Sequence, residues 1–483
     1  MLFTSFSFFV FFAATFFVHW LLAKNNYKFQ NIVLLVASYF FYAWAEWKML
    51  PLLVLCTIVF YVLGKRIKAS SEKAASLLTT IGVVVGVGML LYFKYFNFFI
   101  QSFASFFESL GLSVSVHTFN IIMPLGVSYF TFKLISYVVD LHRNKIDPCD
   151  DFIAFSVYVS FFPTILSGPI DRPQSFIPQI QKVRSFDYSW AVEGLRQFLW
   201  GLFKKVVLAD QIAIVTDRTW SMITLMPGST LLIVAVLYAI QLYMDFSGYS
   251  DMAIGIGKLL GVRITRNFNY PFFATNIAEF WRRWHMSLTS WLTDFVFTPL
   301  SIRFRDWSNC GLILAIIINM TLVGLWHGAD WSFVLFGLYN GLLFVPLIMR
   351  GRLNKKQKYD ISALGLPSLR NLLKMVFVTL LFSLGLVFFR ANSVCDSFLF
   401  LSSIVENGII TMPRYIGMEP LTVIITICVF IWEWYMRKYE FGLMLNESPL
   451  FRNSWSRILC YYVLLTLILI YSGNSQTFIY YQF

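Results

Sequence analysis

Charged residues are scarce in this chain of 483 residues, since Asp, Glu, Lys and Arg together make up only 13% of it. A soluble globular protein carries about 25%. Hydrophobic residues reach 58%, and aromatic residues alone reach 19%. So few charges cannot cover a water-facing surface, and disordered chains are poor in aromatic residues and rich in charge. The composition therefore excludes both of these classes and predicts a polytopic membrane protein.

The sequence also lacks several patterns that would announce a particular chemistry. Its six cysteines are scattered without a C-x-x-C pair, so neither a disulfide framework nor a zinc site is indicated. No H-E-x-x-H run and no G-x-S-x-G elbow occurs. Metal catalysis and a serine hydrolase triad therefore have no sequence support, and we expect no metal site.

Basic residues are in excess, with a formal net charge of +13. They mostly lie in short loops between apolar runs, where the positive-inside rule explains them without a nucleic-acid partner. The first and third loops are basic and the second is neutral, from Lys24 and Lys28, then Glu46 and Lys48, then Lys65, Arg66, Lys68 and Lys73. This alternation predicts an extracytoplasmic N-terminus, and the basic run over 350–358 is predicted to be cytoplasmic.

The apolar runs predict an all-α protein with about 11 to 13 transmembrane or re-entrant helices. Several runs are short or contain proline, as at Pro124 and Pro163, and these could be re-entrant. No linker or internal repeat stands out, so we predict one membrane domain over residues 1–483. The runs lie at 1–22, 30–46, 49–64, 78–96, 121–139, 152–168, 193–209, 229–245, 311–327, 331–349, 371–390, 420–436 and 457–472.

Polar groups at membrane depth are expensive and mark candidate sites. One polar segment, 276–291, begins like a helix, because Asn276 can cap it and Glu279 lies in its first turn. Glu279 precedes Arg283 by four residues, which favours an ion pair. One face is predicted to carry Trp281, Trp284, His285 and Leu288. The alternative is an amphipathic helix at the membrane interface.

A second polar segment closes an apolar helix and places His327 at or near membrane depth. Gly324 is predicted to allow a close helix approach, and Gly328 to end the helix in a left-handed turn. Asn319 lies two turns before His327 on nearly the same face. Alternatively, His327 only bonds a backbone carbonyl beside Trp326.

A third segment, 243–251, places carboxylates and hydroxyls between apolar helices. Asp245 and Asp251 are six residues apart and do not share a helix face, so a paired-carboxylate mechanism is not implied. Asp245 and Ser247 could line a polar tunnel, or these groups could cap helix ends.

Three of these runs, DFSGYSDMAIG (245–255), EFWRRWHMSLTSW (279–291) and GLWHGA (324–329), resemble the membrane-bound O-acyltransferase (MBOAT) superfamily. They look most like its bacterial branch of alginate O-acetyltransferase-like proteins. Supporting matches lie at Pro124–Ser128, Ser167–Pro169 and the C-terminal FIYYQF (478–483). The sequence departs from close relatives after Leu292, in a segment that bears on the acceptor or a docking partner.

The resemblance implies a ring of tilted helices around a central tunnel. Members transfer an acyl group from a donor reached from the cytoplasm to an acceptor on the far side. By analogy His327 is catalytic, and His285 is a second tunnel histidine that positions or activates reactants. Further residues expected to line the tunnel or bind substrate are Trp281, Arg283, Trp284, Asp245, Ser247, Asn319 and Trp326.

The chemistry of acyl transfer agrees with this assignment. A neutral imidazole with a pKa near its reference value of ~6.5 can serve as the base for an attacking hydroxyl. Burial disfavours the imidazolium, so a hydrogen-bond partner is needed, and Asn319 is our candidate. The indoles of Trp326 and Trp284 could stabilise the oxyanion. A thioester donor is already activated, so no tightly bound cofactor is expected.

We therefore predict an O-acyltransferase of the bacterial inner membrane, in particular an O-acetyltransferase. Its donor would be acetyl-CoA or a similar thioester, and its acceptor an extracytoplasmic polysaccharide or a periplasmic partner transferase. The alternatives are D-alanyl transfer to teichoic acid, a lipid-modifying acyltransferase with a lateral opening, and a polysaccharide or lipid transporter. A transporter would show paired inverted repeats, which are not evident in the sequence.

Overall fold

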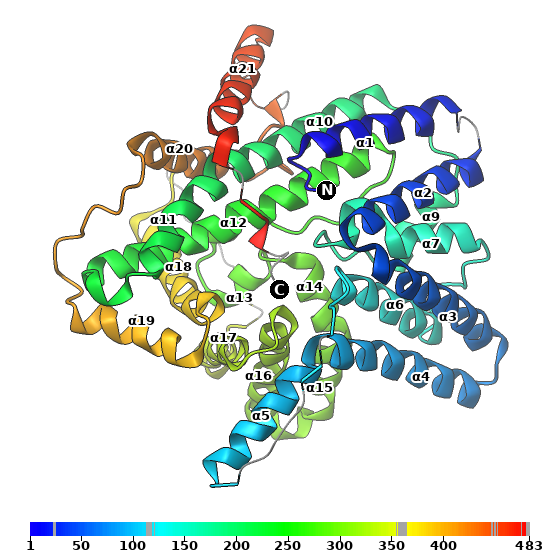
Figure 1. Cartoon of the computed structure of the whole chain (residues 1–483), viewed down its shortest axis with the longest axis horizontal. Coiled ribbons are helices and arrows are strands. Elements are labelled where there is room, and N and C mark those ends of the chain that lie inside the picture. The colour runs from blue at the N-terminus through cyan, green and yellow to red at the C-terminus, as the bar shows by residue number, and fades with distance from the viewer. Residues whose placement is uncertain are drawn as a thin grey trace. The chain divides into compact units, whose positions relative to one another are not determined.

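The computed structural model of the chain describes residues 1–22, 26–112, 118–119, 121–353, 355, 365–445, 448, 451, 453–474 and 476–479. Over these residues the regular structure is helical and contains no β-strand (Figure 1). The prediction of an all-α polytopic membrane protein is confirmed. The basic residues Lys24, Lys356 and Lys358 and the end of the C-terminal motif, 480–483, lie outside the described residues.

Internal contacts divide the chain into two compact units, one of residues 1–198 and 252–265 and the other of 199–251 and 266–483. The prediction of one membrane domain stays a prediction. The predicted ring and central tunnel concern both units together and also stay predictions.

Helix α6 (Val127–His142) lies in the interior of the first unit. Fourteen of the sixteen residues of α6 are buried, because α3 and α4 pack against it. The helices of this unit are α1 (Phe6–Phe17), α2 (Tyr27–Glu46), α3 (Leu50–Ala69), α4 (Glu72–Leu90), α5 (Phe96–Ser109), α6 (Val127–His142), α7 (Phe152–Ser160), α8 (Phe162–Ile165), α9 (Pro173–Ile180) and the larger part of α10 (Tyr188–Phe203).

The run over 152–168 does not form one membrane-length helix. It forms α7 of nine residues and α8 of four, separated at Phe161. Nine residues span about 14 Å, well short of the ~30 Å hydrocarbon core. Pro163 sits in the first turn of α8, where its missing N–H costs no hydrogen bond, so it begins a new helix after the break.

The second unit holds the three polar segments. Its helices are the π-helical turn η4 (Lys204–Ala209), α11 (Asp210–Trp220), α12 (Gly228–Leu259), α13 (Ile277–Trp281), α14 (Met286–Leu292), α15 (Thr298–Arg303), α16 (Ser308–His327), α17 (Trp331–Met349), α18 (Leu369–Arg390), α19 (Val394–Glu406), α20 (Pro420–Met436) and α21 (Ser454–Tyr471). The last turns of α12 belong to the first unit.

Helices α16 and α17 form a tight antiparallel pair because small residues face each other along it. A Cβ on Gly324 would lie 2.1 Å from the carbonyl oxygen of Phe333, and one on Gly337 would lie 2.4 Å from that of Met320. Only residues without a side chain permit this separation. The predicted close approach at Gly324 is confirmed.

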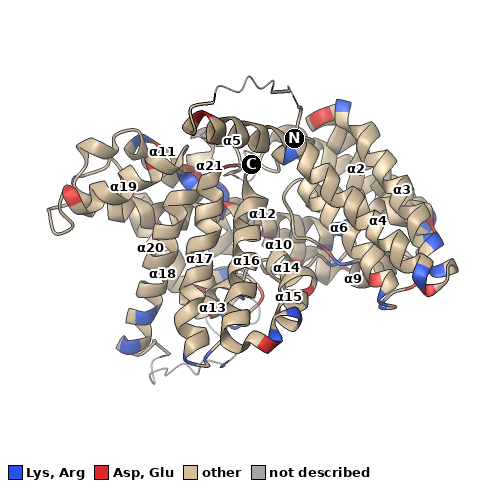
Figure 2. Cartoon of the chain, turned by 90° about the horizontal axis from the view of Figure 1, so that it is seen from below, with Lys and Arg blue, Asp and Glu red and all other residues tan. Residues whose placement is uncertain are grey.

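Seven helical segments of the described chain are long and apolar enough to cross a membrane, and two shorter apolar helices accompany them. Most residues along the long helices are uncharged, and many of the charged residues lie near helix ends or in loops (Figure 2). In the second unit, Lys and Arg mark the lower end of α18 in that view. This distribution is typical of helices in a bilayer.

Candidate active site

The helix predicted over 276–291 breaks in its middle. Helix α13 ends at Trp281 and α14 begins at Met286, and between them His285 adopts a left-handed conformation with φ 43° and ψ 53°. The predicted common face of Trp281, Trp284 and His285 is therefore wrong. The rings of both tryptophans contact Phe382, at centroid distances of 6.1 and 4.9 Å, whereas His285 points elsewhere.

The imidazole of His285 is held by one amide group. Its Nδ1 lies 3.1 Å from Oδ1 of Asn267, and the same oxygen accepts bonds from the Ser287 backbone N–H at 3.2 Å and the Ser287 hydroxyl at 2.9 Å. A backbone N–H can only donate, so the Asn267 atom facing it must be the oxygen. Nδ1 of a neutral His285 therefore carries the proton, and the lone pair lies on Nε2.

Burial keeps His285 neutral. The side chain is 1% exposed, and desolvation lowers the pKa of His285 from 6.5 to about 3. Between these two values the unfolded chain binds a proton that the folded chain does not. The contribution of His285 to stability is therefore present above pH 6.5 and is lost as the pH falls toward 3.

The start of α13 follows the sequence prediction. The Asn276 side chain accepts a bond from the backbone N–H of Glu279 at 2.9 Å, and Glu279 forms an ion pair with Arg283 at 2.8 Å. The second carboxylate oxygen of Glu279 accepts from the Thr275 backbone N–H at 2.9 Å. Arg283 thus braces the turn before His285.

His327 is the last residue of α16 and is 4% exposed. Its ring contacts Trp326, Phe336 and Phe389, with centroids 4.8, 6.2 and 5.0 Å away. The predicted left-handed turn at Gly328 is wrong, because its φ is −159° and the backbone is extended. Glycine is needed there since a Cβ would lie 2.0 Å from the Phe333 ring.

Trp326 brings the two histidines together. Its indole contacts His327 as stated and also His285, with ring centroids 5.5 Å apart. The other side of His285 packs on Phe246 at 4.7 Å. Residues 42 positions apart in the sequence thus share one buried aromatic cluster.

Two other predicted residues are buried in the same unit. Trp281 is 4% exposed and contacts Phe336, the ring that packs on His327, and its indole N–H has no hydrogen-bond partner among the described residues. Asn319 is 6% exposed, and its Oδ1 also lacks a partner within the described chain. It precedes His327 by about 12 Å along α16, so its predicted role as partner of His327 stays a prediction.

Asp245 and Ser247 do not cap a helix end, because α12 runs without interruption from Gly228 to Leu259. Asp245 forms an ion pair with Lys205 at 2.7 Å, and Ser247 accepts from Lys204 at 2.8 Å. Lys204 also pairs with Asp251 at 2.6 Å. The alternative of helix capping is therefore wrong for these residues.

Lys205 and Asp245 bind the C-terminal segment. Asp245 accepts from the backbone N–H of Ile479 at 2.8 Å, and the Lys205 ammonium lies 4.4 Å from the centre of the Phe478 ring. Lys205 pairs with Asp210 as well, at 2.7 Å. Asp245 is thus part of a buried ionic cluster that anchors residues 476–479.

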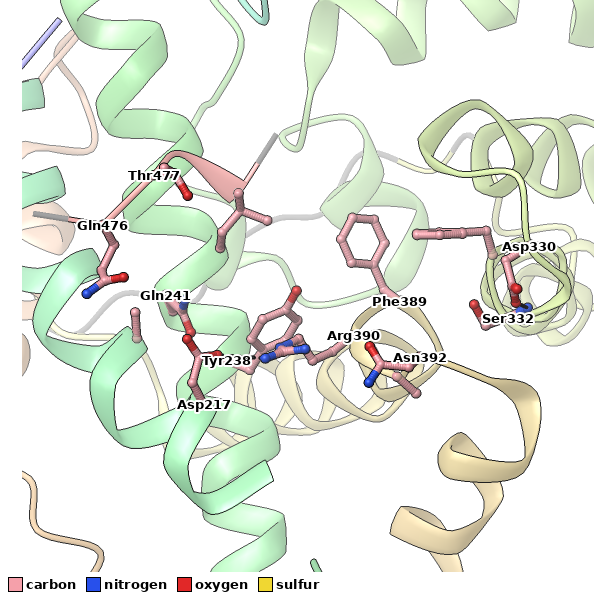
Figure 3. Close-up of a pocket in the computed structure, with 14 residues that line it drawn as sticks. Asp217, Tyr238, Gln241, Asp330, Ser332, Phe389, Arg390, Asn392, Gln476 and Thr477 are labelled. Atoms are coloured by element: carbon pink, nitrogen blue, oxygen red, sulfur yellow. Dashed lines mark hydrogen bonds and ion pairs between the residues drawn. The ribbon is translucent and has the colours of Figure 1, made fainter. Parts of the chain in front are cut away.

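The second unit contains a polar cavity of about 360 Å³ (Figure 3). Phe389 lines this cavity and its ring also contacts the His327 ring, so this one side chain connects the cavity with His327. The cavity is bounded by α11, α12, the start of α17, the end of α18 and residues 476–479. His327 itself does not line it.

A second, apolar cavity of about 350 Å³ lies among α10, α20 and α21. It could be the lateral opening expected of a lipid-modifying enzyme, but neither histidine lines it. No group of three or more His, Cys, Asp or Glu side chains in the described part of the chain could hold a metal ion.

Sequence reasoning missed Asn267, Lys204, Lys205 and Asp210. Asn267 acts on a histidine 18 residues further along, and no spacing rule links them. The lysines gave a signal, because they lie inside the predicted apolar run 193–209, where ionised groups need partners.

A known protein family matches the part of the chain that contains both histidines. The sequence model of the MBOAT, membrane-bound O-acyltransferase family, matches residues 36–387, which include both histidines. The "Probable alginate O-acetylase AlgI" of Azotobacter vinelandii is 35% identical over 373 residues, 76% of this chain and 71% of the relative.

Two relatives have other names. The "Peptidoglycan O-acetyltransferase" of Helicobacter pylori is 31% identical over 80% of this chain and 76% of its own length. The "Teichoic acid D-alanyltransferase" of Bacillus subtilis is 30% identical over 50% of this chain and 62% of its own. Family match, relatives and apolar helices agree: the chain belongs to the membrane-bound O-acyltransferase family and is a multi-pass membrane acyltransferase.

Proposed function

We propose that the chain is an O-acetyltransferase of the bacterial inner membrane. It would move an acetyl group from a cytoplasmic thioester, acetyl-CoA or a similar donor, to an extracytoplasmic polysaccharide or to a periplasmic partner transferase. The observation that carries the proposal is the pair of buried imidazoles, His285 and His327, both of which contact the indole ring of Trp326. A membrane protein retains such groups at a cost, and function is the usual reason.

His327 would be the base. As the acceptor hydroxyl attacks the thioester carbonyl carbon, His327 takes its proton; the new C–O bond forms, the C–S bond breaks, and the proton passes to the leaving thiolate. The products are an acetyl ester and a free thiol. His285, with its lone pair on Nε2 and its orientation set by Asn267, would position or activate a reactant.

The orientation supports an acceptor arriving from outside. The basic residues Arg350 and Arg352 follow α17, and Arg370 and Lys374 lie at the start of α18. By the positive-inside rule these ends face the cytoplasm. The opposite ends, which carry His327 and the polar cavity, would face the extracytoplasmic side.

The coverage of the relatives favours acetyl over D-alanyl as the transferred group. Those named for O-acetylation align over 76% and 80% of this chain, whereas the relative named for D-alanylation aligns over half of it. D-alanyl transfer to teichoic acid is therefore the second candidate. A transporter has no support, because the family is one of acyltransferases.

Mass spectrometry of surface glycans from a deletion strain tests the proposal. We expect acetyl esters that are present in the parent, absent in the deletion strain and restored by the gene. Loss of D-alanyl esters instead would establish the second candidate, and an unchanged ester content would refute both.

A further inference from the structure

The polar cavity beside Phe389 is lined by a tyrosine hydroxyl and a glutamine amide N–H group for which the described residues supply no hydrogen-bond partner. Tyr238 is 2% exposed, and its hydroxyl makes no hydrogen bond within the described residues. Gln241, one turn further on α12 and 5% exposed, accepts from Thr216 at 2.6 Å, while its amide N–H groups have no partner in the described chain. Figure 3 shows both on the cavity wall, with the Tyr238 hydroxyl directed inward. Buried groups of this kind are normally satisfied, so a ligand or water must supply their partners.

The other walls suit a sugar ring. Phe333 and Phe389 present aromatic surfaces, against which the C–H face of a sugar can pack. Neutral amide and hydroxyl groups, including Asn392 and Ser332, lie beside them. Apolar walls with a few polar groups that fix orientation are the usual composition of a small-ligand site.

The charges of the lining disfavour an acidic ligand. Asp217 and Asp330 are carboxylates, and Arg390, the one cation among the described lining residues, forms an ion pair with Asp217 at 2.7 Å. Asp330 accepts from the Ser332 backbone N–H at 2.8 Å and caps the start of α17. By formal charge the described lining carries two carboxylates and one guanidinium, and a uronate would meet no unpaired cation among these residues.

We propose that this cavity is the acceptor site and that it binds a neutral sugar residue, not a uronic acid. The proposal rests on the proposed function, since Phe389 joins the cavity to the predicted base His327. Tyr238 and Gln241 would bind hydroxyls of the sugar and bring another of its hydroxyls toward the thioester. The acceptor of this chain would then differ in charge from alginate, the polyuronate for which several relatives are named.

The variant Tyr238→Phe tests the site, because it removes only a hydroxyl that has no hydrogen-bond partner among the described residues. Its matched control is Tyr42→Phe, which removes another buried hydroxyl that lacks a partner in the described part of the chain, from α2 of the first unit. Loss of one neutral hydrogen bond corresponds to about a fivefold weaker acceptor interaction. We expect Tyr238→Phe to lower the density of acetyl esters on surface glycans about fivefold at equal protein abundance, and Tyr42→Phe to leave it unchanged.

The position of the esters is measured in the same glycans by mass spectrometry, with a His327→Ala strain as reference. Esters that depend on His327 and lie on neutral hexose or amino-sugar residues support the site. If such esters lie on uronic acids or on a protein, or if Tyr238→Phe behaves like Tyr42→Phe, the site assignment is overturned while the acetyltransferase assignment stands. If His327→Ala retains all esters, the proposed function itself fails.

Discussion

Single side chains decide the chemistry of this protein, and the clearest case is Asn267. It was not found from the sequence, because its effect on His285 depends on a loop that folds back over 18 residues. By contrast, the Asn276 cap and the Glu279–Arg283 pair were predicted, because both act within one helical turn. Local hydrogen bonds follow from spacing, whereas contacts between distant residues need the fold.

The variant Asn267→Asp should change the pH dependence of acyl transfer. A carboxylate facing Nδ1–H favours the imidazolium and raises the pKa of His285, which burial now holds at about 3. The neutral fraction at a given pH falls, so the acid limb of kcat/KM should move to higher pH.

Asn267→Ala and Ser287→Ala provide the comparison. Asn267→Ala removes the acceptor of Nδ1–H and should lower the rate without moving the acid limb upward. Ser287→Ala removes a different donor to the same oxygen and should leave the limb in place. An acid limb at the same pH in Asn267→Asp and in the parent would contradict the assigned tautomer.

Lys205 should be essential for stability. Its ammonium group balances the negative charges of Asp210 and Asp245, both of which are about 1% exposed. In Lys205→Met two buried carboxylates lose their counter-ion, and breaking a buried pair in this way costs about 3 to 5 kcal/mol.

Thermal unfolding in detergent measures the effect of Lys205→Met. The control is Lys68→Met, which breaks an exposed pair with Asp147 and should cost less than about 1 kcal/mol. Equal unfolding temperatures for the two variants would show that the buried cluster does not stabilise the fold.

At the level of elements, apolar length and period predicted most long helices, and α2, α3, α16, α17 and α18 lie close to the predicted runs. The errors occur where tertiary packing overrides local pattern. The turn at His285 interrupts a good helical pattern because the Asn267 side chain binds His285 within the break and Ser287 in the first turn of α14. Gly328 is extended because Phe333 occupies the space beside it.

The contact between α16 and α17 gives a test of element packing. In Gly324→Ala the new methyl group would lie 2.1 Å from a backbone oxygen of α17, so the helices must separate, at a cost of about 1 to 3 kcal/mol. Gly88→Ala in α4 meets nothing within 4 Å and should gain up to about 1 kcal/mol from helix propensity. Unfolding temperatures in detergent should therefore fall for the first variant and hold or rise for the second. A tolerated Gly324→Ala would contradict the close packing.

At the level of the whole molecule, composition alone established the class of protein. A chain with only 13% charged residues cannot cover a water-facing surface, so most of its surface must face lipid. The mutual placement of distant ions and loops is not encoded in composition or period. The pairs between η4 and α12 show this, since Lys204–Asp251 and Lys205–Asp245 join residues 47 and 40 positions apart.

Two native cysteines test the orientation. Cys310 lies at the start of α16 and Cys395 at the start of α19, and both are exposed. If the positive-inside assignment holds, a membrane-impermeant maleimide should label Cys395 in intact spheroplasts and reach Cys310 only after permeabilisation. The reverse labelling pattern would show that the membrane orientation is opposite to the one assigned and that the polar cavity faces the cytoplasm.

The most direct test is the rate of acetyl transfer by His327→Ala in membranes with matched protein abundance. The control is His142→Ala, which changes a histidine at the end of α6 outside the aromatic cluster. Removal of a general base costs about 10² to 10⁴ in rate, so we predict a loss of at least about 100-fold for His327→Ala and no loss for His142→Ala. Transfer by His327→Ala at a rate within a few fold of the parent would contradict the account.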